Sequence, residues 1–118
     1  MALINRAAIL LRYKLPAVEW INGCEPGDEE DDVTIEIANE ERTVYLISDE
    51  DADDDESVQR WIELNYQALF ENELDGWYCD DSFWPKNLSL KLFYEWFTVE
   101  CHSVVEDTID APIEREDI

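Results

Sequence analysis

Residues 57–74 read SVQRWIELNYQALFENEL, and this stretch is the clearest helix pattern in the chain. Large or apolar side chains recur at intervals of three and four residues, which is the periodicity of an amphipathic helix. Asp53 or Asp54 is a candidate N-cap, Asp53 with Glu56 has the spacing of a capping box, and Gly76 is expected to end the helix in a left-handed conformation. The predicted buried stripe contains Val58, Trp61, Ile62, Asn65 and Leu69, widened by Leu64 and Ala68.

Segments on both sides of this helix have the patterns of β-strands. Residues 3–13 (LINRAAILLRY) are apolar on both alternating faces, which is typical of a strand covered on both sides. RTVYLIS at 42–48 is rich in β-forming residues, and TVECHSVVED at 98–107 predicts a last strand. VTIEI at 33–37 also alternates, and it predicts either a strand that forms a hairpin with 42–48 or a short helical turn.

Two shorter helices are predicted as well. Pro16 is placed to start a helix over residues 17–22, and Gly23 to end it. NLSLKLFYEWF, which begins at Asn87, predicts a second amphipathic helix with Asn87 or Ser89 as its cap.

The order of these elements predicts the fold class. Strand, helix, hairpin or strand, long helix, helix and strand indicate a single small α+β domain over residues 1–107. We expect a three- or four-stranded, mainly antiparallel sheet packed against two main helices. Residues 108–118 are expected to form an acidic C-terminal tail.

The charge of the chain limits its partners. It carries 31 acidic and 8 basic side chains among 118 residues, a net charge of −23. Contact with nucleic acid requires a basic face, and an anionic membrane surface repels a chain of this charge. We therefore predict a basic protein as the partner, with no direct nucleic-acid binding and no membrane contact.

The acidic runs at 28–32 and 49–56 allow three interpretations: a solvated surface, recruitment or masking of a basic protein, and mimicry of DNA phosphates. Both runs fall in predicted loops, which favours recruitment over a rigid mimic. The aromatic turn (residues 77–84) is a candidate anchor, although aromatic side chains that close one end of the core are the simpler explanation. The candidate partner-binding residues are Asp28, Glu29, Glu30, Asp31, Asp32, Asp49, Glu50, Asp51, Asp53, Asp54, Asp55, Trp77, Tyr78 and Trp84.

No metal or cofactor site is predicted from the spacing of possible ligands. A calcium loop of the EF-hand type needs glycine at its sixth position and glutamate at its twelfth. Loops that start at Asp28, Asp49 or Asp51 have neither. The same spacing test gives no zinc finger from the cysteines and the single histidine.

A small enzyme or metal-binding protein that uses His102 with a thiol or carboxylates is the alternative function. Cys101 precedes His102 on a predicted strand, so their side chains point to opposite faces. Cys24, Cys79 and Cys101 are odd in number and widely spaced, which indicates thiols in a reducing compartment. With an N-terminus that is neither a signal peptide nor a membrane span, the predicted location is the cytoplasm.

Four stretches resemble a group of small acidic bacterial proteins, mostly from proteobacteria, that have no assigned activity. They are INRAAILLRYK (4–14), RTVYLIS (42–48), NYQALFENELDGWYCDDSFWP (65–85) and EWFTVECHSVVEDT (95–108). The resemblance covers most of the chain and implies a bacterial cytoplasmic protein. It carries over no functional residue.

Overall fold

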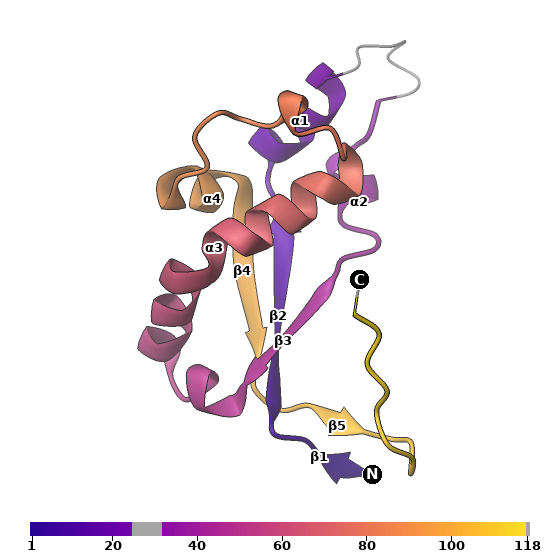
Figure 1. Cartoon of the computed structure of the whole chain (residues 1–118). Helices are drawn as coiled ribbons and strands as arrows, with labels where there is room; N and C mark the ends of the chain where they lie inside the picture. The colour runs from indigo at the N-terminus through magenta and orange to yellow at the C-terminus, as the bar shows by residue number, and fades with distance from the viewer. Residues whose placement is uncertain (25–31, 118) are drawn as a thin grey trace.

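The computed structural model describes residues 1–24 and 32–117, and it has the predicted α+β fold (Figure 1). No helix in these residues is both long enough and apolar enough to cross a membrane. The helices are α1 (Leu15–Cys24), α2 (Ile35–Ala38), α3 (Asp55–Trp77) and α4 (Leu90–Trp96), with two 3₁₀ helices, η2 (Asp49–Ala52) and η3 (Asp81–Phe83). The strands are β1 (Ala2–Leu3), β2 (Arg6–Tyr13), β3 (Val44–Ser48), β4 (Phe97–His102) and β5 (Glu106–Asp107).

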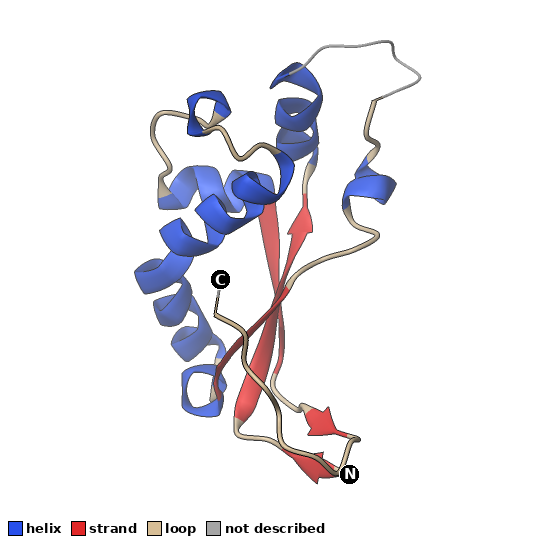
Figure 2. Cartoon of the chain, turned by 45° about the vertical axis from the view of Figure 1, so that its right-hand side comes forward, coloured by secondary structure: helices blue, strands red, loops and turns tan. Residues whose placement is uncertain are grey.

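The main sheet has three antiparallel strands in the order β3-β2-β4, which confirms the predicted sheet. In its register, Ile9 of β2 lies opposite Tyr45 of β3 and Cys101 of β4. β1 and β5 form a separate two-stranded antiparallel sheet beside the N-terminus. The helices α1, α3 and α4 lie on one side of the main sheet (Figure 2).

The core lies between β2 and these helices. The inward face of β2 presents Ala7, Ile9, Leu11 and Tyr13, which are all buried, as the two-residue period of a strand requires. Three fully buried phenylalanines meet this face, with ring centroids 5.3–5.8 Å apart. Such large side chains give a small domain enough buried apolar area to fold. They are Phe70 of α3, Phe93 of α4 and Phe97 of β4.

The prediction that β2 is covered on both sides holds only in part for its second face. Ala8 on that face is buried and Leu10 is half-buried. Their neighbours on β3, Val44 and Leu46, are 52% and 51% exposed. Helices pack on one face of the sheet alone, so the apolar run in β2 did not indicate a second layer.

Residues 33–37 do not form the hairpin strand that their alternation predicted. Thr34 caps the short helix α2 by accepting a hydrogen bond from the Ile37 backbone N–H at 3.1 Å. After this helix, the Asn39 side chain accepts from the Tyr13 N–H at 2.8 Å and donates to the Tyr13 carbonyl at 3.2 Å. The Asn39 side chain thus makes the hydrogen bonds that a neighbouring strand would make at the end of β2. β3 pairs with β2 and not with residues 33–37.

The N-terminus of α3 is capped by one of the two aspartates that the sequence offers. Asp54 accepts a hydrogen bond from the Ser57 N–H at 2.7 Å, and this bond holds the pKa of the Asp54 carboxyl below its usual value. Asp53 is not the cap, so the capping box with Glu56 is wrong.

The buried face of α3 departs from the predicted stripe in the middle and the C-terminal half of the helix. Leu64 is 79% exposed and Ala68 is exposed, whereas Phe70, Glu73 and Leu74 are buried. Gly76 lies within the helix and does not have a positive φ, so the predicted left-handed end is also wrong. The helix continues to Trp77, where the backbone turns into an extended conformation at Tyr78.

The remaining elements follow the sequence closely. The predicted helix at 17–22 is part of α1, which begins at Leu15 and includes Gly23, so Gly23 does not end it as predicted. α4 is capped by Ser89, which accepts from the Leu92 N–H at 3.1 Å. The predicted last strand is shorter than 98–107, because β4 ends at His102 and the chain then leaves the sheet for β5.

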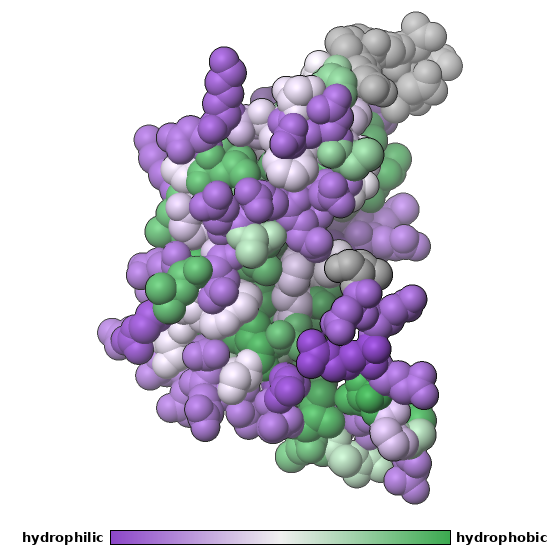
Figure 3. All heavy atoms as spheres, in the orientation of Figure 1, coloured by the Kyte–Doolittle hydropathy of each residue, from purple (hydrophilic) through white to green (hydrophobic). Residues whose placement is uncertain are grey.

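The segment after β5 runs back beside β3 (Figures 1 and 2). Ile113 and Arg115 of this segment line a cavity of about 430 Å³ together with Arg6 and Leu46. Figure 3 shows hydrophilic side chains over most of the face that α3 crosses, with hydrophobic ones gathered low on that face, between α3 and this segment.

Candidate functional site

The acidic run at 49–55 is helical at both ends, where the expectation of a loop is wrong, and Asp53 and Asp54 form the bend between the two helices. Asp49–Ala52 form η2, and Asp55 begins α3. Asp51 is half-buried, and the other acids of the run are exposed. Of the earlier run at 28–32, residues 28–31 lie outside the described residues, and Asp32 is exposed.

The carboxylates of the acidic run are not neutralised by internal ion pairs. Arg12 and Arg42 both pair with Glu100, and Lys91 pairs with Glu95. Within residues 1–24 and 32–117, no ion pair uses a carboxylate of the run. Three of these acids, Asp49, Glu50 and Asp53, line a cavity of about 430 Å³ with Ala52 and Ser103, immediately after the end of β4.

A groove of about 530 Å³ runs between β4 and the N-terminal half of α3. Apolar side chains line it on both sides: Val58 and Ile62 from α3, and Phe97 and Val99 from β4. Lys14 also lines the groove, and its ammonium donates to the Tyr94 carbonyl at 2.9 Å.

Asp55 connects the groove to the acidic run. It lines the groove together with Cys101 of β4. Burial and, secondarily, the nearby charge of Asp55 raise the pKa of the Cys101 thiol. The groove therefore has apolar side chains on both sides, among polar ones, and Asp55 gives it a negative charge where it approaches η2.

The backbone of β4 faces this groove with unused hydrogen-bonding groups. The Lys14 N–H donates to the Trp96 carbonyl at 2.8 Å, which makes this a hydrogen-bonded pair of the antiparallel ladder. Every second residue along the ladder repeats that arrangement, so Thr98, Glu100 and His102 direct their backbone groups to β2. The backbone groups of Val99 and Cys101, which alternate with these, point away from β2. That side is open, because β4 has no second neighbour within the described sheet.

The aromatic turn packs against α1, as the simpler interpretation predicted. The Tyr78 hydroxyl donates to the Ile21 carbonyl at 2.7 Å, and the Trp84 indole donates to the Tyr78 carbonyl at 2.8 Å. Both rings are half-buried, as is Trp77, while Phe83 is 37% exposed.

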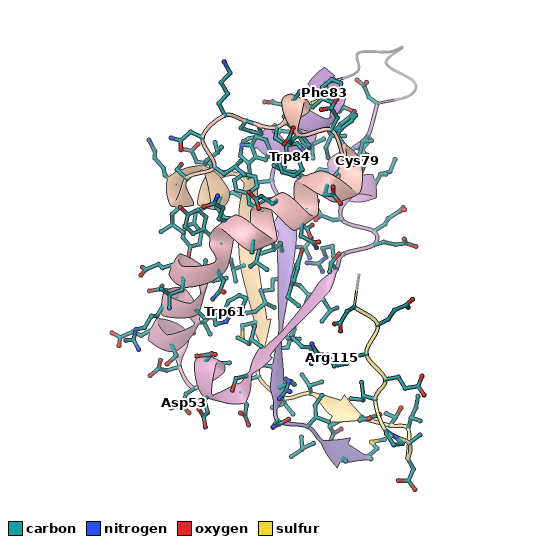
Figure 4. The ribbon with its side chains drawn as sticks, viewed as in Figure 1. Asp53, Trp61, Cys79, Phe83, Trp84 and Arg115 are labelled. Atoms are coloured by element: carbon teal, nitrogen blue, oxygen red, sulfur yellow. The ribbon has the colours of Figure 1, made fainter. Side chains whose placement is uncertain are left out.

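The aromatic turn and the acidic run do not form one surface. Trp84 and Phe83 lie at the opposite end of the molecule from Asp53 (Figure 4). α3 joins the two regions, and its 23 residues hold them about 30 Å apart. The structure therefore does not bring together the two halves of the candidate binding set.

A second polar centre surrounds Glu73, which the sequence analysis did not single out. Glu73 is 8% exposed, and it is the one buried charged side chain among the described residues. One of its oxygens accepts from the Tyr13 hydroxyl at 2.9 Å, and the other accepts from the Tyr45 hydroxyl. The Trp77 indole donates to the Tyr13 oxygen at 2.8 Å, and Asn72 donates to the Tyr45 oxygen at 2.9 Å.

This network keeps both tyrosines protonated. Burial raises the pKa of Tyr13, and the neighbouring negative charge of Glu73 raises it further. Burial and the hydrogen bond to Glu73 raise the pKa of Tyr45 in the same way. Each tyrosine has one hydroxyl hydrogen and gives it to Glu73, so the hydrogen-bond pattern around Glu73 is that of a carboxylate.

The helical stripe contained the signal that could have located Glu73. Position 73 follows Ile62 and Leu69 at helical spacing, so it belongs to the buried face of α3. A glutamate at such a position requires polar partners within the core. Those partners come from β2 and β3, and strand pairing between distant segments is not visible in the pattern of α3.

The residues of the alternative function lie apart. Cys101 lies on the face of β4 that lines the groove, and His102 lies on the opposite face, exposed at the end of the strand. Cys79 is at the far end of the molecule (Figure 4). Among residues 1–24 and 32–117, no three His, Cys, Asp or Glu side chains are arranged to hold a metal ion.

No family model, no curated protein and no solved structure matches this chain. The resemblance to acidic bacterial proteins therefore stays a prediction.

Proposed function

We propose that this protein is a protein-binding module that takes an extended, basic segment of a partner along β4. The observation that carries the proposal is the open edge of β4, which lies beside an apolar groove and ends at the acidic run. An added strand pairs its backbone with Val99 and Cys101 and places alternate side chains in the groove. Its basic side chains then reach the carboxylates of η2 and Asp55.

Charge selects the class of partner. A second copy of the chain also has a net charge of −23, so pairing β4 with β4 brings two strongly negative surfaces together. A basic segment gains from the same field, which raises its rate of association and makes the complex sensitive to salt. The edge of β4 and the acidic run then either recruit the partner or mask its basic segment.

Mimicry of DNA is a second candidate, because Asp49, Glu50, Asp51 and Asp55 lie on helices rather than in a loop. Helices hold these four acids in a fixed arrangement, which a rigid mimic of phosphates requires. Under mimicry the partner is a nucleic-acid-binding protein, and duplex DNA displaces it from the acidic surface. Under recruitment through β4, an edge-strand variant weakens binding, whereas under mimicry it does not.

The test compares variants in a tagged capture from bacterial lysate at about 100 mM and about 500 mM salt, read by mass spectrometry. The first variant neutralises the run at Asp49, Glu50, Asp53 and Asp55, and it leaves the cap Asp54 intact. The control neutralises four exposed acids elsewhere and so loses the same charge: Glu19, Glu36, Glu40 and Asp75.

We expect a basic protein that the wild type and the control retain at low salt and that the first variant loses. Retention of the same proteins by all three chains contradicts the proposal, as does the absence of any retained basic protein. Cys101→Pro then tests the strand edge, because it removes an N–H that faces the open side and leaves the ladder with β2 intact. Unchanged binding by a folded Cys101→Pro chain excludes strand addition.

A further inference from the structure

A cavity of about 200 Å³ opens beside Glu73, between α2, α3 and the segment that leads into β3. Glu73 and Asn72 line it from α3, Tyr13 and Trp77 contribute aromatic rings, and Glu41 contributes an exposed carboxylate. The cavity thus combines two acids with two aromatic side chains, and it contains no cationic residue among its described lining.

The carboxylate of Glu73 has no cation to balance it. Arg12 and Arg42 are both used by Glu100, which is more exposed than Glu73. No described Lys, Arg or His side chain pairs with Glu73. A buried charge without a partner of opposite sign is costly, even when hydrogen bonds satisfy its oxygens.

We propose that this cavity binds a primary alkylammonium group, of the kind carried at the end of a lysine side chain or by a small aliphatic amine. The ammonium supplies the positive charge that Glu73 lacks, and Glu41 adds a second carboxylate beside it. The rings of Tyr13 and Trp77 are suited to the cation and to its alkyl chain. The small volume favours a compact ammonium over a larger ligand.

A metal ion fits the cavity less well. Both oxygens of Glu73 already accept hydrogen bonds from tyrosines, and the remaining lining offers too few oxygen ligands for calcium or magnesium. An alkylammonium needs fewer contacts and uses the aromatic walls as well. The proposal does not depend on the strand site at β4, because the two lie toward opposite ends of α3.

The test is a titration of the folded chain with n-butylammonium, followed by the NMR signal of the Trp77 indole N–H. This N–H donates to the Tyr13 hydroxyl, so its shift reports on the cavity. Trp77→Phe assigns the signal. n-Butanol has the same chain without the charge, and it serves as the matched probe.

We expect saturable binding of n-butylammonium to the wild type and no saturable binding of n-butanol. Glu73→Gln keeps the shape of the side chain and is expected to weaken binding by about tenfold or more. Glu41→Gln, an exposed change that leaves the core intact, is expected to weaken binding by about twofold to fivefold. Asp75→Asn removes an exposed carboxylate of the same helix that does not line the cavity, and binding is expected to be unchanged.

Three results overturn the proposal. The first is no saturable shift with n-butylammonium in the wild type. The second is equal binding by the wild type and by Glu41→Gln and Glu73→Gln chains whose spectra show a folded protein. Equal shifts from n-butanol have the same meaning, because they show that charge does not determine binding.

Discussion

Replacing Tyr13 by phenylalanine removes one hydroxyl from the centre of the Glu73 network. The ring stays in the core against Phe97, at a centroid distance of 5.0 Å, so the change leaves no large cavity. Two polar groups lose their partner: the Glu73 oxygen that accepted from the hydroxyl at 2.9 Å, and the Trp77 indole that donated to it at 2.8 Å.

The expected loss of stability follows from these two groups. A hydrogen bond to a charged group contributes about 1.5–3 kcal/mol, and the half-buried indole N–H adds about 1 kcal/mol when it is left without an acceptor. Tyr13→Phe should therefore lower the free energy of unfolding by about 3 kcal/mol. In a domain of this size, that corresponds to a fall in Tm of about 12 °C.

Urea unfolding of Tyr13→Phe, Glu73→Met and the double variant tests this explanation. If the cost arises from a carboxylate left without its donor, removing the carboxylate also removes that cost. The double variant should then be more stable than the sum of the single effects by about 1–3 kcal/mol. Additive losses would refute the reasoning, and so would a loss below about 1 kcal/mol in Tyr13→Phe alone.

Three further predictions concern other residues. The raised pKa values of Tyr13 and Tyr45 mean that the fold holds both neutral, so the stability they contribute is complete below about pH 10 and is lost as the pH rises above it. The urea midpoints measured at about pH 9 and pH 11 should therefore differ less for Tyr13→Phe than for the wild type. Gly76→Ala should stabilise the chain by about 0.5–1 kcal/mol in thermal melts, because the added Cβ meets no atom within 4 Å and the residue is helical. Ser89→Ala should destabilise it by about 1 kcal/mol through loss of the α4 cap, while Asn87→Ala, whose side chain caps no helix, should have a smaller effect.

The helices and strands could be predicted where local periodicity decides the structure. The pattern of 57–74 marked α3, and the apolar run around Ile9 marked β2. Residues 33–37 could not be assigned in this way, because VTIEI suits a strand as well as a helical turn. The hydrogen bonds of Thr34 and Asn39 favour the helical turn. Asn39 bonds to Tyr13, which lies 26 residues away in the chain.

The candidate site was less predictable than the fold, since it depends on which distant segments meet. The acidic run is conspicuous in the sequence, but the groove beside it is formed by α3 and β4, which are far apart in the chain. Glu73 is one of 31 acids in the sequence, and only the fold shows that it lies between two tyrosines. An excess of carboxylates conceals the one that is buried.

The position of the two proposed sites along α3 makes each a control for the other. The acidic run ends in the first turn of the helix, and Glu73 lies in its last turns. The distance between them is about 30 Å, several times the Debye length of about 8 Å at physiological salt, so the charge of one site is largely screened at the other. Neutralising Asp49, Glu50, Asp53 and Asp55 should therefore leave n-butylammonium binding unchanged, and Glu73→Gln should leave capture of a basic protein unchanged at physiological salt. If the run variant weakens both, the negative field of the whole chain attracts cations without a local site, and the geometry of neither site explains the binding.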